Sequence, residues 1–455
     1  MRKSFDFYPY GYPKSGIYYD DDNAYFMHED HCTVKRFQEF KNVGFTMALL
    51  QSESTIDGSV PFEKSECART MKVARKAGIK RMILSDTRLK LLCEEEVLVG
   101  EGGRFANDNE LEAYLLECTA PYRNEEGFYG LQLRDEPKRH MLVSYGKVCR
   151  ALKKVIPNVY LQCNLFPITD VLQKDGEDIF EAYENYLNEF LQESQMDSIL
   201  FDEYPFRVKY IIGGHSIRTR QIVARVCKKW GVEFRMVLQS FSMTLPNSQK
   251  TSVRVVCRAV REPDMYWQSN LAMGFGCTEY SYFTYTARAK NWFTDEYNPD
   301  GASFINRDGT RSKLYYYTKR IIREMKRFAP IQLAHKYENC WFAFEEGKTA
   351  KDFMQTEFAE INEACPIDVK VNQGVVIITK LSGQKTDLYM VQNVGNVKDE
   401  YFDGVGPVVA NINLGEKAKA KVYKCGKKVK RKIIDGKFDE KLHVGDAIFV
   451  LVDKK

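Results

Sequence analysis

Closely spaced pairs of cysteines are absent from this sequence, although its 455 residues include twelve cysteines. No two of them have the C-x-x-C spacing that zinc sites and redox motifs use. Most lie inside apolar runs, which is typical of buried free thiols in a reducing compartment and not of a disulfide framework. The cysteines therefore predict a cytoplasmic protein and indicate no metal or redox site.

Long apolar runs are absent as well. No segment reaches the ~18 consecutive apolar residues that a membrane-spanning helix needs. The amino-terminal segment MRKSFDFYPYGYPKSGIYYDDD has basic residues but lacks the apolar core of a secretion signal. We therefore expect a soluble protein with no membrane partner.

A strong charge of one sign is also lacking, because 67 basic and 62 acidic residues give a net charge of only +5. This balance does not indicate a nucleic-acid partner. Much of the excess lies at residues 417–432, where a solvated hairpin or a lysine-protected edge strand is favoured over an anion site.

A glycine-rich phosphate loop is missing too. The nearest match, GEGGRF at residues 100–105, has Phe105 where the dinucleotide fingerprint has its third glycine. An open, doubly wound nucleotide-binding sheet is therefore disfavoured.

What the chain does have is a regular alternation of short apolar segments with longer helical ones, which is typical of parallel βαβ units. We predict strands at residues 44–50, 81–86, 128–136, 159–165, 198–204, 233–240 and 277–285. We predict helices at residues 33–41, 61–77, 109–119, 138–154, 179–195, 216–230, 252–273 and 312–328. An eighth strand at residues 332–334 or 340–344 would close a (β/α)8 TIM barrel.

Both ends of the chain differ from this pattern. Residues 1–30 are rich in tyrosine and lack periodicity, so we expect a loop packed across a surface. From about residue 367, short alternating segments between turn residues predict an all-β sandwich. The expected α/β architecture is a barrel domain with an aromatic leader at residues 1–335 and a β-sandwich accessory domain at residues 336–455.

Two predicted strands end in paired carboxylates that precede a proline. The sequence LRDEP at residues 133–137 places Asp135 and Glu136 at one strand end, and FDEYP at residues 201–205 places Asp202 and Glu203 at another. Proline cannot extend a strand, so these groups should lie where the strands meet their loops. Barrel enzymes keep catalytic groups there, and we expect one shared acidic site.

Two acidic groups with different pKa values are what glycoside cleavage requires. One protonates the departing oxygen and the other attacks the sugar or activates water, and no metal or other cofactor is needed. A carboxyl separation of about 5 to 5.5 Å would mean retention of the anomeric configuration, and about 6.5 to 9.5 Å inversion.

Three further motifs accompany these strand ends: WQSNLAMGFG at residues 267–276, YFTY at residues 282–285 and NRDGT at residues 306–310. With them the chain resembles bacterial glycoside hydrolases of the (β/α)8 clan, in particular family 42-type β-galactosidases. The resemblance implies an enzyme that removes a terminal sugar from a small β-linked glycoside or oligosaccharide, with retention of configuration.

The resemblance also implies residue roles. In that clan the acid/base glutamate ends the fourth strand after an asparagine, and the nucleophilic glutamate ends the seventh. Glu136 matches the first, although Asp135 replaces the asparagine and would accept a hydrogen bond where the asparagine donates one. Our strand count places Glu279 near the start of the seventh strand, and Asp202 and Glu203 are rival carboxylates that are preferred by position.

The remaining residues of the expected site would bind the sugar, through aromatic rings against its C–H faces and planar polar groups on its hydroxyls. The candidates are Arg134, Asp135, Asn164, Tyr204, Gln239, Trp267 and Tyr282. The expected partner is a small carbohydrate. The resemblance is also compatible with a homo-oligomer, because barrel glycosidases of this type often form oligomers.

Two alternatives stay open. A catalytically silent carbohydrate-binding barrel is favoured by the replaced asparagine and by the lack of one clear nucleophile. A non-glycosidic barrel enzyme such as an aldolase or lyase would need a lysine at a strand end, and no predicted barrel strand has one.

Overall fold

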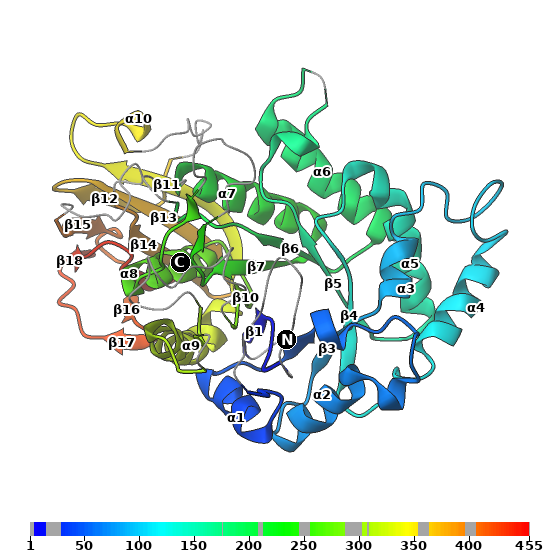
Figure 1. The fold of residues 1–455 in the computed structure, drawn as a ribbon. Helices are drawn as coiled ribbons and strands as arrows, with labels where there is room; N and C mark the ends of the chain where they lie inside the picture. The colour runs from blue at the N-terminus through cyan, green and yellow to red at the C-terminus, as the bar shows by residue number, and fades with distance from the viewer. Residues whose placement is uncertain are drawn as a thin grey trace.

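Eight parallel strands form the centre of the molecule (Figure 1). The computed structural model describes residues 4–14, 29–174, 176–207, 213–244, 255–286, 303–306, 309–353, 364–395 and 406–454, which leaves residues 307 and 308 of the NRDGT motif outside. The strands lie in the order β1-β10-β7-β6-β5-β4-β3-β2. Their bounds are β1 Asp6–Tyr10, β2 Ala48–Leu50, β3 Met82–Ser85, β4 Phe128–Asp135, β5 Tyr160–Leu165, β6 Ser198–Asp202, β7 Glu233–Gln239 and β10 Glu279–Phe283.

The ring closes between β1 and the residues just before β2. The N–H of Thr46 donates to the carbonyl oxygen of Phe7 at 2.7 Å, and the N–H of Phe7 donates to the Thr46 hydroxyl at 3.1 Å. Alternate residues of each strand point inward. Among them Tyr8, Met47 and Val237 pack in one apolar cluster. The predicted (β/α)8 barrel is confirmed.

Helices surround the ring (Figure 1). Several begin with a polar side chain that accepts a hydrogen bond from the first turn, as Thr33 does for α1 and Asp178 for α6. The helices are α1 Val34–Val43, α2 Glu66–Lys76, α3 Thr87–Leu92, α4 Asp108–Thr119, α5 Leu142–Val155, α6 Ile179–Ser194, α7 Gly213–Trp230, α8 Glu262–Gly274 and α9 Lys313–Gln332. No helix of the described segments is both long and apolar enough to cross a lipid bilayer.

Two predictions about barrel elements were wrong. The strand that completes the barrel was expected at residues 332–334 or 340–344, but neither segment joins the barrel sheet, and residues 336–344 form β11 of a C-terminal sheet. The missing strand is instead β1, which was expected to be part of a loop, and it pairs with β10 so that Tyr10 lies opposite Phe283. β10 is therefore the eighth strand of the ring and β7 is the seventh. The helix expected from residue 252 begins only at Glu262, because Val255–Cys257 forms β9, which pairs with β8 (Met243–Thr244).

The C-terminal part is a sandwich of two antiparallel sheets. One sheet has the order β11-β13-β14-β19-β16-β17 and the other β12-β15-β18. Ile378 of β13 faces the sandwich core, whereas its neighbour Ile377 faces the barrel, so this sheet is apolar on both faces. The bounds are β11 Lys336–Phe344, β12 Asp368–Val371, β13 Val375–Ser382, β14 Thr386–Asn393, β15 Val408–Asn413, β16 Ala420–Lys424, β17 Lys427–Val429, β18 Lys437–Leu442 and β19 Ala447–Asp453, with the short helix α10 Ala350–Phe353.

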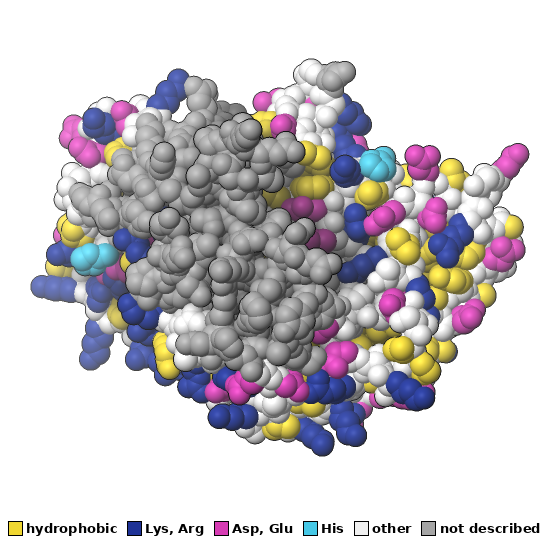
Figure 2. Space-filling view, in the orientation of Figure 1, with side chains coloured by type: hydrophobic (Ala, Val, Ile, Leu, Met, Phe, Trp, Pro, Cys, Tyr) yellow, Lys and Arg dark blue, Asp and Glu magenta, His cyan; other side chains and the backbone are white. Residues whose placement is uncertain are grey.

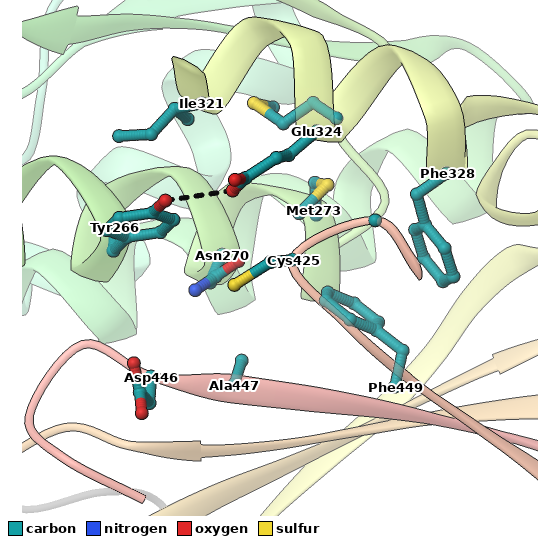
Figure 3. Close-up of a pocket in the computed structure, with 12 residues that line it drawn as sticks. Tyr266, Asn270, Met273, Ile321, Glu324, Phe328, Cys425, Asp446, Ala447 and Phe449 are labelled. Carbon is teal, nitrogen blue, oxygen red and sulfur yellow. Dashed lines mark hydrogen bonds between the residues drawn. The ribbon is translucent and has the colours of Figure 1, made fainter. Parts of the chain in front are cut away.

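The sandwich packs tightly on α8 and α9 of the barrel (Figure 3). The rings of Phe328 and Phe449 are 4.6 Å apart, and the hydroxyl of Tyr266 donates to Glu324 at 2.8 Å. At Gly426, in the turn between β16 and β17, a Cβ atom would lie 2.1 Å from the carbonyl oxygen of Glu324, so this approach requires glycine. The cavity between these residues has a volume of about 20 Å³, room for about one water.

The lysine-rich segment at residues 417–432 forms a hairpin at the edge of the six-stranded sheet. β16 pairs with β17, the outermost strand, and Lys427 and Lys428 are exposed. Figure 2 shows lysine and arginine side chains gathered at the lower left, where β16 and β17 lie in Figure 1. The predicted lysine-protected edge strand is confirmed.

Candidate active site

The end of β4 is shaped by a bulge that turns Asp135 toward the barrel axis. Gln132 lies opposite Gln162, but the register then shifts, so that Asp135 lies opposite Asn164. The bulge thus keeps both Gln132 and Asp135 on the inner face of the strand. β4 is the fourth strand of the ring, as the acid/base position in the resemblance requires.

Glu136 follows this strand in an unusual backbone conformation. Its φ of 48° lies in the left-handed region, which costs a non-glycine residue about 1 kcal/mol or more. Its N–H donates to the carbonyl oxygen of Asn164 at 2.7 Å, which fixes the turn. Burial, and then the negative charges of Asp202 and Asp135, raise the pKa of Glu136 to about 8. At neutral pH this carboxyl group holds a proton.

Asp202 is the inward-facing carboxylate at the end of β6. It is only 7% exposed, and burial raises its pKa to about 6, although hydrogen bonds from Tyr204 and Asn164 act in the opposite direction. At neutral pH Asp202 is therefore mostly ionised. The site thus holds two carboxyl groups whose environments separate their pKa values.

Asn164 connects the carboxylates. Its Nδ2 donates to Oδ1 of Asp135 at 3.1 Å and also lies close enough to Asp202 to lower the pKa of that group. Because carboxylates need donors, this orientation of the amide is the one that satisfies them. The opposite oxygen, Oδ1 of Asn164, and Oδ1 of Asp202 are buried and accept no hydrogen bond from the described residues.

Aromatic side chains at or just past the ends of four strands lie beside these carboxylates. Tyr204 packs on Phe241 with ring centroids 4.8 Å apart and on Phe283 at 5.8 Å, and Tyr10 lies 6.0 Å from Phe283. Tyr10 accepts a hydrogen bond from Gln162 at 3.1 Å, and burial together with Asp135 and Asp202 raises its pKa. Tyr204 was predicted for the site, whereas the other aromatic residues were not.

Arg134 and Lys90 lie on the α3 side of this site. Arg134 forms an ion pair with Glu94 at 2.6 Å, so the positive charge of Arg134 is balanced by a carboxylate outside the barrel strands. Lys90 was not predicted. Its pKa is lowered by burial and by Arg134, while the charge of Asp135 opposes the shift, which places Lys90 close to that carboxylate.

Glu203 points away from the other carboxylates. Its oxygens accept hydrogen bonds from Arg220 at 2.8 Å and Thr219 at 3.0 Å, both in α7. Arg220 is fully buried, so the pair lies between the barrel wall and the helix. Consecutive strand residues face opposite sides, which is why Asp202 and Glu203 separate.

Glu279 lies at the other end of the barrel. It begins β10, opposite Arg235 of β7 and Asp6 of β1 near the starts of those strands. The hydroxyl of Tyr160 donates to Glu279, and Nε of Arg235 lies 3.8 Å from its second oxygen. The assignment of Glu279 to the seventh strand was wrong, and the structure does not bring it to Glu136.

The seventh strand ends in an amide. Gln239 is fully buried and is held by main-chain groups, since it accepts from the N–H of Phe206 at 3.0 Å and donates to the carbonyl oxygens of Phe206 and Phe241. No aspartate or glutamate occurs between Glu233 and Glu262. The loop after β7 therefore contributes no carboxylate.

Two predicted sugar platforms are buried elsewhere. Trp267 has no exposed surface, and its Nε1 donates to the carbonyl oxygen of Val394 in the sandwich at 3.0 Å. Tyr282 is also fully buried, against Phe45 and Phe304. The described part of the chain contains no group of three histidine, cysteine or acidic side chains placed to hold a metal ion.

No protein-family model matches the chain, and no curated protein matches it. Among solved structures it is similar to a catalytic mutant of Gan42B, a GH42 β-galactosidase from G. stearothermophilus, with 8% identity, a TM-score of 0.56 and coverage of 100% of this chain and 99% of the other. It is also similar to an α-amylase from Anoxybacillus, with 10% identity, a TM-score of 0.52 and coverage of 100% and 98%. At these identities the likeness is one of fold: the chain has the barrel and C-terminal β-domain architecture of solved glycoside hydrolases.

Proposed function

We propose that this protein is a glycoside hydrolase that cleaves a terminal sugar from a small β-linked glycoside with two carboxyl groups, Glu136 and Asp202. The observation that supports it is their placement at the ends of the fourth and sixth strands, with pKa values of about 8 and about 6. One protonated and one ionised carboxyl group at neutral pH are the two states that glycoside cleavage uses.

Glu136 would be the general acid, because it holds a proton at neutral pH and lies at the strand end where a barrel substrate binds. Asp202 would be the partner carboxylate. The half-buried rings of Tyr204 and Phe283 offer apolar faces to the C–H surface of a sugar. Asp135, which is exposed, offers an acceptor to its hydroxyls.

The fold neighbours support glycoside hydrolysis as the class of reaction, since one is named a β-galactosidase and the other an α-amylase. The polar candidates Arg134 and Gln239 already have protein partners, so we leave them out of the proposed site. We also leave out Trp267 and Tyr282, which have no exposed surface.

The test is turnover of a panel of 2,4-dinitrophenyl, 4-nitrophenyl and alkyl β-glycosides by the wild type and Glu136→Gln. We expect the variant to lose roughly 10² to 10⁴ in kcat on alkyl glycosides, whose leaving groups need a proton. The loss should be much smaller on 2,4-dinitrophenyl glycosides, which leave without one. Glu416→Gln, an exposed position of the sandwich, is the matched control. Equal activity of Glu136→Gln and this control would contradict the proposal.

A second candidate is a carbohydrate-binding barrel without catalysis. The absence of any carboxylate from residues 234–261 favours it, because the seventh-strand position then cannot supply a nucleophile. Calorimetric binding of a sugar by wild type, without turnover of any glycoside in the panel, would support this candidate over the enzyme.

A further inference from the structure

The described strand ends leave Asp202 as the buried partner of Glu136. Asp86, which follows β3, accepts hydrogen bonds from Arg88 and from Tyr122 at 2.9 Å. Glu203 is paired with Arg220 in α7. Asp86 and Glu203 are therefore already bound by other side chains of the protein. Asp135 is exposed beside Glu136 rather than across from it.

Asp202 is poorly placed to attack a sugar carbon itself. A nucleophile must come within about 3 to 3.5 Å of the carbon. Only 7% of Asp202 is exposed, and hydrogen bonds from Tyr204 and Asn164 already engage it. Its carboxyl group is therefore largely covered by the protein.

Two acceptor atoms of residues on the adjacent strands β5 and β6 lack donors. Oδ1 of Asp202 and Oδ1 of Asn164 are buried without a hydrogen-bond partner among the described residues. Both residues are more than nine-tenths buried, and buried acceptors in native proteins nearly always have a donor. Water has two O–H groups and is the smallest donor that serves two acceptors.

We propose that a water molecule held by Asp202 and Asn164 is the nucleophile, so that hydrolysis inverts the anomeric configuration. This inference rests on the proposed function. It replaces the retaining outcome that the resemblance implies.

In this reaction the bond between the anomeric carbon and the glycosidic oxygen breaks, and Glu136 gives its proton to that oxygen. The water oxygen forms a bond to the anomeric carbon from the opposite face, and Asp202 takes a proton from the water. Asp202 then releases this proton to solvent and Glu136 takes one up. One water is consumed for each bond cleaved, and no covalent intermediate forms.

Asn164 is a positioning residue here, because it acts on the water and on Asp202 and not on the sugar. Asn164→Ala should lower kcat about 10- to 100-fold with little change in KM. It should also move the acidic limb of the pH profile upward, because the lost N–H donor had lowered the pKa of Asp202. Asn164→Asp, which keeps the shape, serves if the alanine variant does not fold. A higher KM with unchanged kcat and pH profile would contradict this role.

The decisive measurement is ¹H NMR of the first sugar released from the β-glycoside that the wild type hydrolyses fastest, with and without added methanol. We expect the α-anomer first and no methyl glycoside. The β-anomer first, or a methyl glycoside of retained configuration, would overturn the inference while leaving hydrolysis established. Failure to hydrolyse any glycoside would contradict both the proposed function and this inference.

Discussion

Glu136 and Asp202 lie at the ends of β4 and β6, which are separated by β5, yet the charge of Asp202 adds to burial in raising the pKa of Glu136 to about 8. Burial and this charge together keep Glu136 protonated at neutral pH, where Asp202 is mostly ionised. The catalytic proposal can therefore be tested through pH, since each group should control one limb of the pH dependence of kcat/KM.

We expect a bell-shaped dependence of kcat/KM on pH, with limbs near pH 6 and pH 8. Below about 6 Asp202 becomes protonated and cannot accept a proton, and above about 8 Glu136 loses the proton that it must give. The measurement is kcat/KM of wild type and the Glu416→Gln control across pH 4 to 10. An optimum below pH 5 would show that these two groups do not control the reaction.

Asp202 should lower the stability of the protein at high pH. Its pKa is raised on folding from 3.8 to about 6, so stability falls as pH rises through this window and the buried group ionises. Asp202→Asn should therefore be more stable than wild type at pH 8, by up to about 3 kcal/mol, with little gain at pH 3.5. Urea denaturation at both pH values measures this difference. A variant that is less stable at both would refute it.

The pair of Glu203 and Arg220 should matter for folding and not for turnover. Arg220→Met leaves a carboxylate buried without its cation, which should cost about 3 to 5 kcal/mol in unfolding free energy. The double variant with Glu203→Gln should recover part of that loss. Urea denaturation gives the free energies, and kcat per folded molecule should stay near the wild-type value. If Glu203→Gln folds normally but is inactive, Glu203 belongs to the active site after all.

Glu279 and Arg235 form a second test pair at the other end of the barrel. Arg235→Met should destabilise the protein by about 3 to 5 kcal/mol, because Glu279 has no exposed surface and loses its neighbouring cation. Glu279→Gln should relieve part of this loss and should leave kcat unchanged. Thermal or urea unfolding together with glycoside turnover checks both statements. Loss of turnover in a stable Glu279→Gln variant would restore Glu279 as a nucleophile candidate.

Most of the barrel could be predicted from the sequence, because its strands and helices alternate with clear changes of period. The predicted strands at residues 159–165 and 233–240 agree closely with β5 and β7. β1 was missed because DFYPY contains Pro9, and all five of its residues are buried, so no alternation marks it. One missed strand shifts the count of every later one, which is why Glu279 was assigned to the seventh.

The carboxylates could be located but not oriented. Asp202 and Glu203 are neighbours at one strand end, and the sequence does not show which of two consecutive residues points inward. The bulge in β4 likewise depends on pairing with β5, which no local pattern in residues 128–137 indicates. Tyr10 and Phe283 meet only because the first and eighth strands pair, so their place in the site needed the three-dimensional structure.

The pairing of β1 with β10 has a consequence for how the protein is made. Residues 6–10 are synthesised roughly 14 to 55 s before their partner at residues 279–283, at about 5 to 20 residues per second. During that interval the nascent chain holds most of a parallel sheet with an unpaired hydrogen-bonding edge. Slow or crowded synthesis should therefore make this chain dependent on chaperones, and pairing between two growing copies is the expected way for it to misassemble.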